Sequence, residues 1–141
     1  MKVLVDTCVW SLALRRRDSL INDAYYMELV ALIEANRIAL IGPIRQELLS
    51  GIRHTAQFTK VRDKLRYFPD TVLTETDYEL AAENYNACKQ RGIQGSNTDF
   101  LICAIAIRCN QAILTLDQDF EHFAGILPIR LLKPRFELGV L

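Results

Sequence analysis

The sequence predicts an α/β fold of three layers, in which a parallel sheet of four or five strands carries helices on both faces. Short hydrophobic runs alternate along the chain with longer segments whose hydrophobic residues recur at helical spacing, and such alternation is typical of strand–helix–strand units. The first run, Val3 to Val5, is hydrophobic at every position, as expected for a strand inside a sheet covered on both sides.

The first half of the chain is expected to contain two strands. After the strand at Lys2 to Val5, one helix is predicted from about Thr7 and another over residues 20–36, where hydrophobic residues recur near the 3.6 period. The second strand is Ile38 to Ile41. Pro43 then suits the first turn of a helix that runs to Ser50 and stops at Gly51. A basic amphipathic segment follows at residues 55–67.

The second half is expected to add three more strands, at residues 71–73, 112–116 and 129–132. Thr74 or Thr76 caps a long helix that ends near Gln90, where Arg91-Gly92 provides a stop. The hydrophobic segment from Asp99 to Cys109 is predicted to be a helix because of its length, its alanines and the possible cap at Ser96. A short helical turn is expected over residues 117–123.

Composition indicates one ordinary domain. A chain of 141 residues, half of them hydrophobic, is the usual size for a single well-buried core, so we expect one domain over residues 1–141. Lys plus Arg equals Asp plus Glu, at 17 each, so the strongly basic total typical of many nucleic-acid binders is missing. The sequence shows no signal-peptide pattern and no run of roughly 20 hydrophobic residues, which predicts a cytoplasmic protein with no membrane partner.

Four acidic residues lie at or near the ends of predicted strands or open the helices that follow: Asp6, Glu47, Asp99 and Asp117. In an open parallel sheet, functional residues converge beyond the carboxyl ends of the strands. Each acid also has a purely structural explanation, such as Asp6 as a helix cap or Asp99 as the acid of a capping box begun by Ser96. Several carboxylates in one crevice repel one another unless cations neutralise them. A set of oxygen ligands favours Mg²⁺ or Mn²⁺, which commonly bridge to phosphate.

Four blocks of sequence carry a family resemblance. They are V-L-V-D-T-C-V-W at 3–10, P-I-R-Q-E-L-L-S-G at 43–51, N-T-D-F-L-I-C-A-I-A at 97–106 and L-T-L-D-Q-D-F at 114–120. In order and spacing they resemble the four motifs of PIN-domain nucleases, and most closely those of VapC-type toxins from bacterial toxin–antitoxin pairs. The resemblance spans nearly the whole chain, so it implies a PIN-like three-layer fold with a parallel sheet of four or five strands, and a single PIN-like nuclease domain over residues 1–141.

The resemblance implies a Mg²⁺-dependent endoribonuclease, with Mn²⁺ able to substitute. Asp6 would be the central metal ligand, Asp99 and Asp117 would complete the site directly or through water, and Glu47 would orient a water or hold a second ion. Hydrolysis by an activated water would leave 5′-phosphate and 3′-hydroxyl ends. The same resemblance implies an RNA substrate, a cognate antitoxin that covers the acidic site, and a homodimer.

Several details stay open at this stage. Asp119 is an alternative to Asp117 as the fourth acid. The Thr7 hydroxyl would bind either Asp6 or the scissile phosphate, and Asn97 and Thr98 would contact phosphate or, with better odds, cap their loop. His54 and His122 are expected at the surface near helix ends and receive no role.

Substrate and partner surfaces are less well defined by the sequence. Arg15, Arg16 and Arg17, with Arg45 and Arg53, would form a basic rim for the RNA backbone, or else a solvated helix end. Trp10, Tyr25 and Tyr26 lie where related proteins often form a dimer or antitoxin surface, although core packing is the better expectation for Trp10. The four cysteines form no C-x-x-C pair and are expected to be buried, reduced thiols rather than zinc ligands or disulfides.

Two alternative functions remain. One is a PIN nuclease for RNA processing that has no antitoxin. The other is a non-catalytic, receiver-like module that binds Mg²⁺. Receivers need a Lys after a late strand, for which Lys133 is placed, and a phosphoacceptor Asp after a central strand, which the sequence does not offer.

Overall fold

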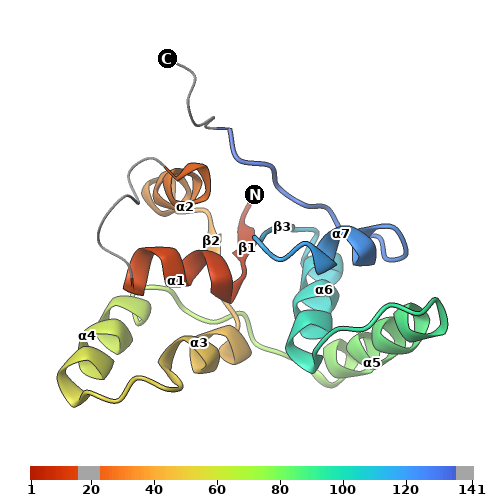
Figure 1. The fold of residues 1–141 in the computed structure, drawn as a ribbon, viewed down its shortest axis with the longest axis horizontal. Helices are drawn as coiled ribbons and strands as arrows, with labels where there is room; N and C mark the ends of the chain where they lie inside the picture. The colour runs from red at the N-terminus through yellow and green to blue at the C-terminus, as the bar shows by residue number, and fades with distance from the viewer. Residues whose placement is uncertain (16–22, 136–141) are drawn as a thin grey trace.

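The computed structural model describes residues 1–15 and 23–135 (Figure 1). Its parallel sheet has the order β2-β1-β3, formed by β1 (Val3–Val5), β2 (Ile38–Ala39) and β3 (Ala112–Leu114). Leu4 of β1 pairs with Ala39 on one side and with Ile113 on the other. The helices are α1 (Thr7–Arg15), α2 (Ala24–Glu34), α3 (Gly42–Leu49), α4 (Thr55–Leu65), α5 (Glu75–Gln90), α6 (Asn97–Cys109) and α7 (Asp119–Ala124).

The sheet has fewer regular strands than the sequence predicts. In the described residues, the two outer segments each make a single parallel bridge, one between Leu40 and Asp70 and the other between Ile113 and Leu131. Pro69 and Pro128 precede these segments and cannot donate a ladder hydrogen bond. The outer segments therefore lie in the positions of a fourth and a fifth strand without forming regular strands.

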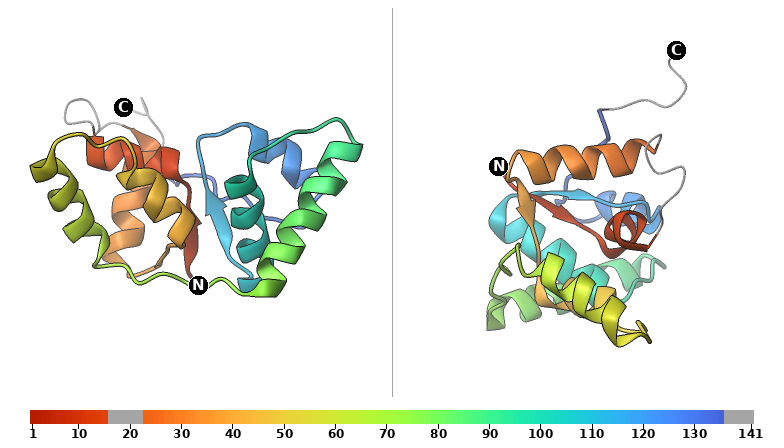
Figure 2. Two further views of the ribbon diagram at one scale, coloured as in Figure 1. Left: turned by 90° about the horizontal axis from the view of Figure 1, so that it is seen from below. Right: turned by 90° about the vertical axis from the view of Figure 1, so that its left-hand side faces the viewer.

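Helices cover both faces of the sheet, which confirms the three-layer α/β prediction. In Figure 1, α1 to α4 lie on one side of β1, and α5 to α7 lie on the other. The right-hand view of Figure 2 shows α2 above the sheet and α4, α5 and α6 below it. All three residues of β1 are buried, as expected for a central strand. Because β1 is central and ends at Asp6, our sequence argument that no central strand ends in an Asp is wrong.

An ion pair between Asp77 and Arg108 fixes α5 against α6. Asp77 is 1% exposed, and it accepts hydrogen bonds from Arg108 Nε at 2.6 Å, Arg108 Nη2 at 3.0 Å and the Thr74 backbone at 2.8 Å. Burial alone would raise the pKa of Asp77, but these hydrogen bonds hold it below the ordinary value. The pair joins the start of α5 to the end of α6, so the opposite end of α6 is held towards the carboxyl edge of the sheet.

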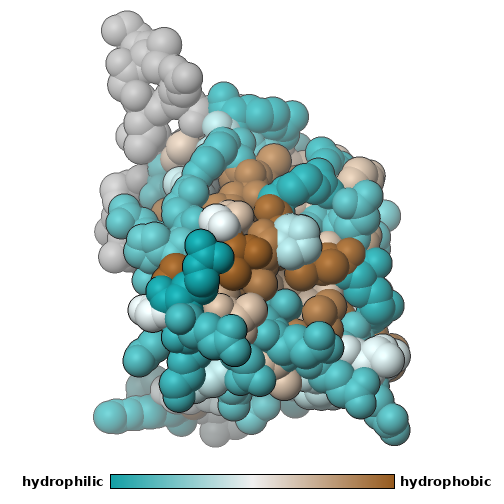
Figure 3. All heavy atoms as spheres, turned by 90° about the vertical axis from the view of Figure 1, so that its right-hand side faces the viewer, coloured by the Kyte–Doolittle hydropathy of each residue, from teal (hydrophilic) through white to brown (hydrophobic). Residues whose placement is uncertain are grey.

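The surface on the side of α5 and α7 gathers hydrophobic side chains at its centre, with hydrophilic ones around them (Figure 3). Cys88 and Cys103 are buried, whereas Cys8 and Cys109 are partly exposed, and all four are free thiols. Within the two described ranges, no helix is long and apolar enough to cross a membrane.

Candidate active site

The site is built around Asp6, the residue that follows β1. Its backbone N–H donates to the carbonyl of Leu114 at 2.9 Å, which places Asp6 beside the end of β3. The side chain is 7% exposed. Its Oδ1 accepts a hydrogen bond from the Thr7 backbone, and its Oδ2 accepts one from the Thr115 hydroxyl, both at 2.8 Å. Two neighbouring strands therefore fix the orientation of this carboxylate.

Glu47 reaches the site through Thr7. The Thr7 hydroxyl donates to Glu47 Oε1 at 2.6 Å, whereas the backbone N–H of Thr7 is the group that donates to Asp6. The structure thus gives the Thr7 hydroxyl a partner that neither of our two sequence options included. This contact joins α3 to the start of α1 and brings Glu47 next to Asp6.

Asp99 caps α6 and also feels the charges of other acids. Asp99 Oδ2 accepts from the Ser96 backbone at 3.0 Å, and the Asp99 backbone donates to Ser96 Oγ at 3.1 Å, so the predicted capping box is present. Burial raises the pKa of Asp99, the hydrogen bonds with Ser96 lower it, and the charges of Asp6 and Asp117 raise it further. Asp99 therefore caps α6 and also lies within electrostatic reach of two other acids.

Asp117 and Asp119 interact with different groups in the structure. The charge of Asp117 contributes to the raised pKa values of both Asp6 and Asp99. Asp119 is the first residue of α7, and its backbone N–H donates to Asp117 Oδ1 at 2.9 Å. The charge of Asp117 therefore acts on Asp6 and on Asp99, Glu47 is joined to this edge through Thr7, and Asp119 serves as a backbone donor to Asp117.

The charges of neighbouring carboxylates disfavour the charged forms of Asp6 and Asp99. Burial raises the pKa of Asp6, hydrogen bonds from Thr115, Thr7 and Cys8 lower it, and the charge of Asp117 raises it again. The charges that act most strongly on Asp6 and Asp99 are those of other carboxylates. A bound cation would remove this repulsion, which is the observation in favour of a metal ion here.

In three of the four carboxylates, one oxygen accepts a hydrogen bond from the described residues and the other oxygen accepts none. Asp99 Oδ2, Asp117 Oδ1 and Glu47 Oε1 accept hydrogen bonds. Asp99 Oδ1, Asp117 Oδ2 and Glu47 Oε2 accept none from residues 1–15 or 23–135. In the same ranges, no three His, Cys, Asp or Glu side chains are already close enough to hold a metal. Binding would therefore draw these oxygens together, and an all-oxygen set suits a hard divalent cation.

The sequence analysis missed Thr115. It follows β3, and its hydroxyl donates to Asp6 Oδ2 at 2.8 Å and accepts from the Asp117 backbone at 3.0 Å. Cys8 Sγ lies 3.5 Å from the same hydroxyl. Thr115 therefore links Asp6 to the loop that carries Asp117. The available signal was its place in the block L-T-L-D, two residues before the acid.

The basic rim is only partly present in the described residues. Arg45 does not point to a substrate, because it is paired with Asp70 at 2.8 Å and also donates to the carbonyl of Phe68. Arg53 is exposed. The side chain of Arg15, and all of Arg16 and Arg17, lie outside the described residues.

The remaining predictions concern aromatic and histidine side chains. Trp10 is buried and packs edge-on against Phe68, with ring centroids 5.3 Å apart, which confirms the core expectation. Tyr25 and Tyr26 are partly exposed at the start of α2. His54 and His122 are exposed, before α4 and within α7. In the described part of the chain, the side chains of Asn97 and Thr98 make no hydrogen bond, because Ser96 is the residue that caps α6.

Comparison with known proteins gives consistent results. The family model of the PIN domain matches residues 3–126. The chain is 32% identical over 126 residues to VapC ribonuclease Mb1587 of Mycobacterium bovis and to ribonuclease VapC11 of Mycobacterium tuberculosis, with 88% of this chain and 92% of each relative covered.

Solved structures agree with this fold. The crystal structure of FitAcB from Neisseria gonorrhoeae matches with a TM-score of 0.74 and 20% identity, over 94% of this chain and 97% of that one. The crystal structure of VapBC2 from Rickettsia felis, bound to a DNA fragment from their promoter, matches with a TM-score of 0.74 and 23% identity, over 94% and 98% of the two chains. At these identities, the likeness concerns the fold.

Proposed function

Because the chain belongs to the PIN-domain family and is a ribonuclease related to the VapC enzymes, we propose that Asp6, Asp99 and Asp117 bind the Mg²⁺ ion with which it cleaves RNA. PIN-domain ribonucleases are in general metal-dependent. The observation that carries the proposal is the electrostatic proximity of these carboxylates. The charge of Asp117 raises the pKa of both Asp6 and Asp99. Mn²⁺ has similar ligand preferences and is expected to substitute.

Each residue of the proposed site has its own role in RNA hydrolysis. When bound, a divalent ion supplies activation of a water and offsets the charge that grows on the phosphate. Asp6 is held by Thr7 and Thr115, and Asp99 is held by Ser96, so hydrogen bonds orient both carboxylates before an ion binds. Glu47, fixed through Oε1 by Thr7, is left with Oε2 to accept a hydrogen bond from the attacking water and orient it towards the phosphorus. We expect 5′-phosphate and 3′-hydroxyl products.

We further propose that the protein is the toxin of a toxin–antitoxin pair and works as a cytoplasmic homodimer. The kinship with VapC ribonucleases supports the toxin role, and the fold neighbours VapBC2 and FitAcB support a partner protein. The competing function is RNA processing without an antitoxin. The adjacent reading frame separates the two, because a small upstream gene with a DNA-binding N-terminal pattern belongs only to the toxin case.

The test is cleavage of total cellular RNA by the purified protein with Mg²⁺, with Mn²⁺ and with a chelator. The Asp6→Asn, Asp99→Asn double variant should lose cleavage. The matched control is Asp119→Asn, which removes a nearby charge but no proposed ligand. Discrete metal-dependent fragments that the double variant does not produce would support the proposal. Cleavage that persists in the folded double variant, or in chelator, would overturn the site assignment, and intact RNA under every condition would contradict RNA hydrolysis by this protein.

A further inference from the structure

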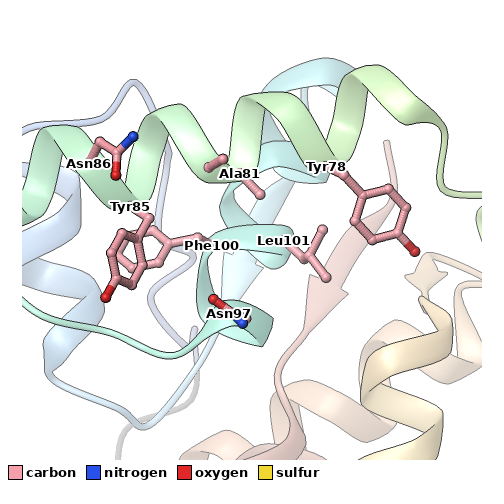
Figure 4. Close-up of a pocket in the computed structure, with 8 residues that line it drawn as sticks. Tyr78, Ala81, Tyr85, Asn86, Asn97, Phe100 and Leu101 are labelled. Atoms are coloured by element: carbon pink, nitrogen blue, oxygen red, sulfur yellow. The ribbon is translucent and has the colours of Figure 1, made fainter.

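A pocket of about 500 Å³ lies between α5 and α6, beside the candidate active site. We call it the α5–α6 pocket. Its volume is in the range of about 300–1,000 Å³ that is usual for ligand sites. Figure 4 shows the arrangement of its principal lining side chains, which are Tyr78, Tyr85, Asn86, Asn97, Phe100 and Leu101.

Two of the aromatic rings that line the α5–α6 pocket pack against other aromatic rings. Tyr85 packs edge-to-face on Phe100, with ring centroids 5.5 Å apart and an interplanar angle of 74°, and Phe100 in turn packs on Phe123. Tyr78 lies two helical turns before Tyr85 on the same side of α5, and it is 53% exposed. The pocket therefore offers rigid and accessible aromatic surface.

The polar groups of the pocket are suited to a nucleotide. Asn86 and Asn97 are exposed, and neither side-chain amide has a hydrogen-bond partner in the described ranges. The Lys89 ammonium lies 5.8 Å from the centre of the Tyr85 ring. No carboxylate is among the described residues that line the pocket. The lining thus combines aromatic rings with uncharged hydrogen-bonding groups, and Lys89 supplies a positive charge beside the Tyr85 ring.

The α5–α6 pocket and the acidic site share the first turn of α6. Asn97 and Phe100 line the pocket, and Asp99 lies between them in the first turn of the same helix. A strand whose phosphate lies at the carboxylates therefore has the pocket within reach of a neighbouring nucleotide.

We propose that the α5–α6 pocket binds one unpaired nucleobase of the RNA substrate, adjacent to the scissile phosphate; this inference rests on the proposed function. Proteins that recognise single-stranded RNA stack splayed bases on aromatic side chains and read the base edges with polar groups. Tyr78 and Tyr85 supply the stacking surface, Asn97 and Asn86 supply donors and acceptors for the base edge, and Lys89 supplies charge for the backbone. A second copy of the chain is the competing occupant.

The experiment uses short single-stranded RNAs in which one position at a time is made abasic around the cleaved bond. With wild-type protein, one position should raise KM by roughly 5- to 150-fold, the equivalent of ~1–3 kcal/mol for one stacked base, with little effect on kcat. Tyr78→Ala and Tyr85→Leu should raise KM for intact RNA by a similar factor and should remove most of the abasic effect. The matched control is Tyr67→Ala, because Tyr67 is 76% exposed and lies outside the pocket.

The outcomes separate this inference from the proposed function. Absence of metal-dependent RNA cleavage in the wild type would remove the function and the inference together. Cleavage with equal KM at every abasic position would overturn the inference alone. If Tyr78→Ala or Tyr85→Leu instead changes the oligomeric state measured by light scattering, the pocket is a protein contact and the inference is overturned. Should Tyr85→Leu fail to fold, Tyr78→Ala still decides the question, because that ring is half exposed.

Discussion

The Asp6→Asn variant tests the electrostatic reasoning most directly. Asn has almost the shape of Asp, and its amide can keep the two shorter of the three contacts, since its oxygen accepts from the Thr7 backbone and its NH₂ group can donate to Thr115 Oγ1, while the 3.5 Å bond from Cys8 Sγ is lost. The Thr115 hydroxyl hydrogen can then turn towards Cys8 Sγ, 3.5 Å away. The substitution therefore removes one buried charge with little change in packing.

The size of the effect follows from two opposing contributions. Hydrogen bonds to a charged group contribute about 1.5–3 kcal/mol and neutral ones about 0.5–1.5 kcal/mol, so two weakened bonds cost roughly 2 kcal/mol. The pKa of Asp6 is nevertheless raised, with burial the largest cause, so burial together with the Asp117 charge outweighs those bonds. A net gain on the order of 1 kcal/mol raises Tm by about 3 °C in a chain of this size.

The pH dependence has a defined sign. Because the pKa of Asp6 is raised from its ordinary value of 3.8, the unfolded wild type releases this proton first as the pH rises. The unfolded state then binds fewer protons than the native state, so wild-type stability falls through this window. The advantage of Asp6→Asn should therefore be absent below pH 3.8, grow as the pH rises through the raised pKa, and stay constant above it.

The assay is thermal unfolding of wild type and Asp6→Asn in chelator and in saturating Mg²⁺. In chelator at pH 7 the variant should be the more stable protein. Mg²⁺ at a hundred times its Kd should stabilise the wild type by about 2.7 kcal/mol, so the order should reverse. A variant less stable than the wild type in chelator would refute the burial reasoning, and equal stabilisation of both by Mg²⁺ would refute the metal assignment.

Four other substitutions have distinct expected results. Thr115→Val removes the hydroxyl between Asp6 and the Asp117 loop, so kcat for RNA cleavage should fall roughly 10- to 100-fold with KM nearly unchanged; a normal kcat would exclude a positioning role. Asp117→Asn should reduce cleavage more than ~100-fold, whereas Asp119→Asn should leave it within a factor of about three, and the opposite order would reassign the fourth acid. Asp77→Asn weakens the buried pair with Arg108, so urea denaturation should show a loss of ~1–3 kcal/mol at pH 7, and this loss should shrink as the pH falls through the lowered pKa of Asp77.

Local signals made most of the fold predictable. The helix that begins at Asn97 was recognisable because its start depends only on Ser96 and Asp99, three residues apart. The central strand was recognisable because all of its residues are hydrophobic. The outer segment at residues 71–73 has a strand-like composition, yet Val72 is 77% exposed and pairs with no strand. Pairing depends on distant partners and on Pro69, so composition alone could not establish it.

The site was predictable where strand order determines position, and not where it depends on helix packing. Parallel strands bring their carboxyl ends to one edge, which is why the positions of Asp6 and Asp117 pointed to a common site. The partner of the Thr7 hydroxyl depends on how α3 packs against α1, and the sequence carries no local trace of that contact. Thr115 was missed because threonine is common in strands and carries no charge, so only its contacts reveal its role.

The structural and catalytic explanations of the acids turned out to be complementary. Asp99 caps α6 and Asp117 binds the start of α7, each with one oxygen, and the other oxygen accepts no hydrogen bond from the described residues. The capping bonds orient each carboxylate before an ion arrives, so less conformational freedom is lost on binding. It follows that alanine substitutions at these positions would mix loss of a helix cap with loss of a ligand. Asparagine keeps an acceptor for the capping bond and replaces the other oxygen by an NH₂ group, so a cleavage defect in the Asn variants can be attributed to the loss of the charged metal ligand.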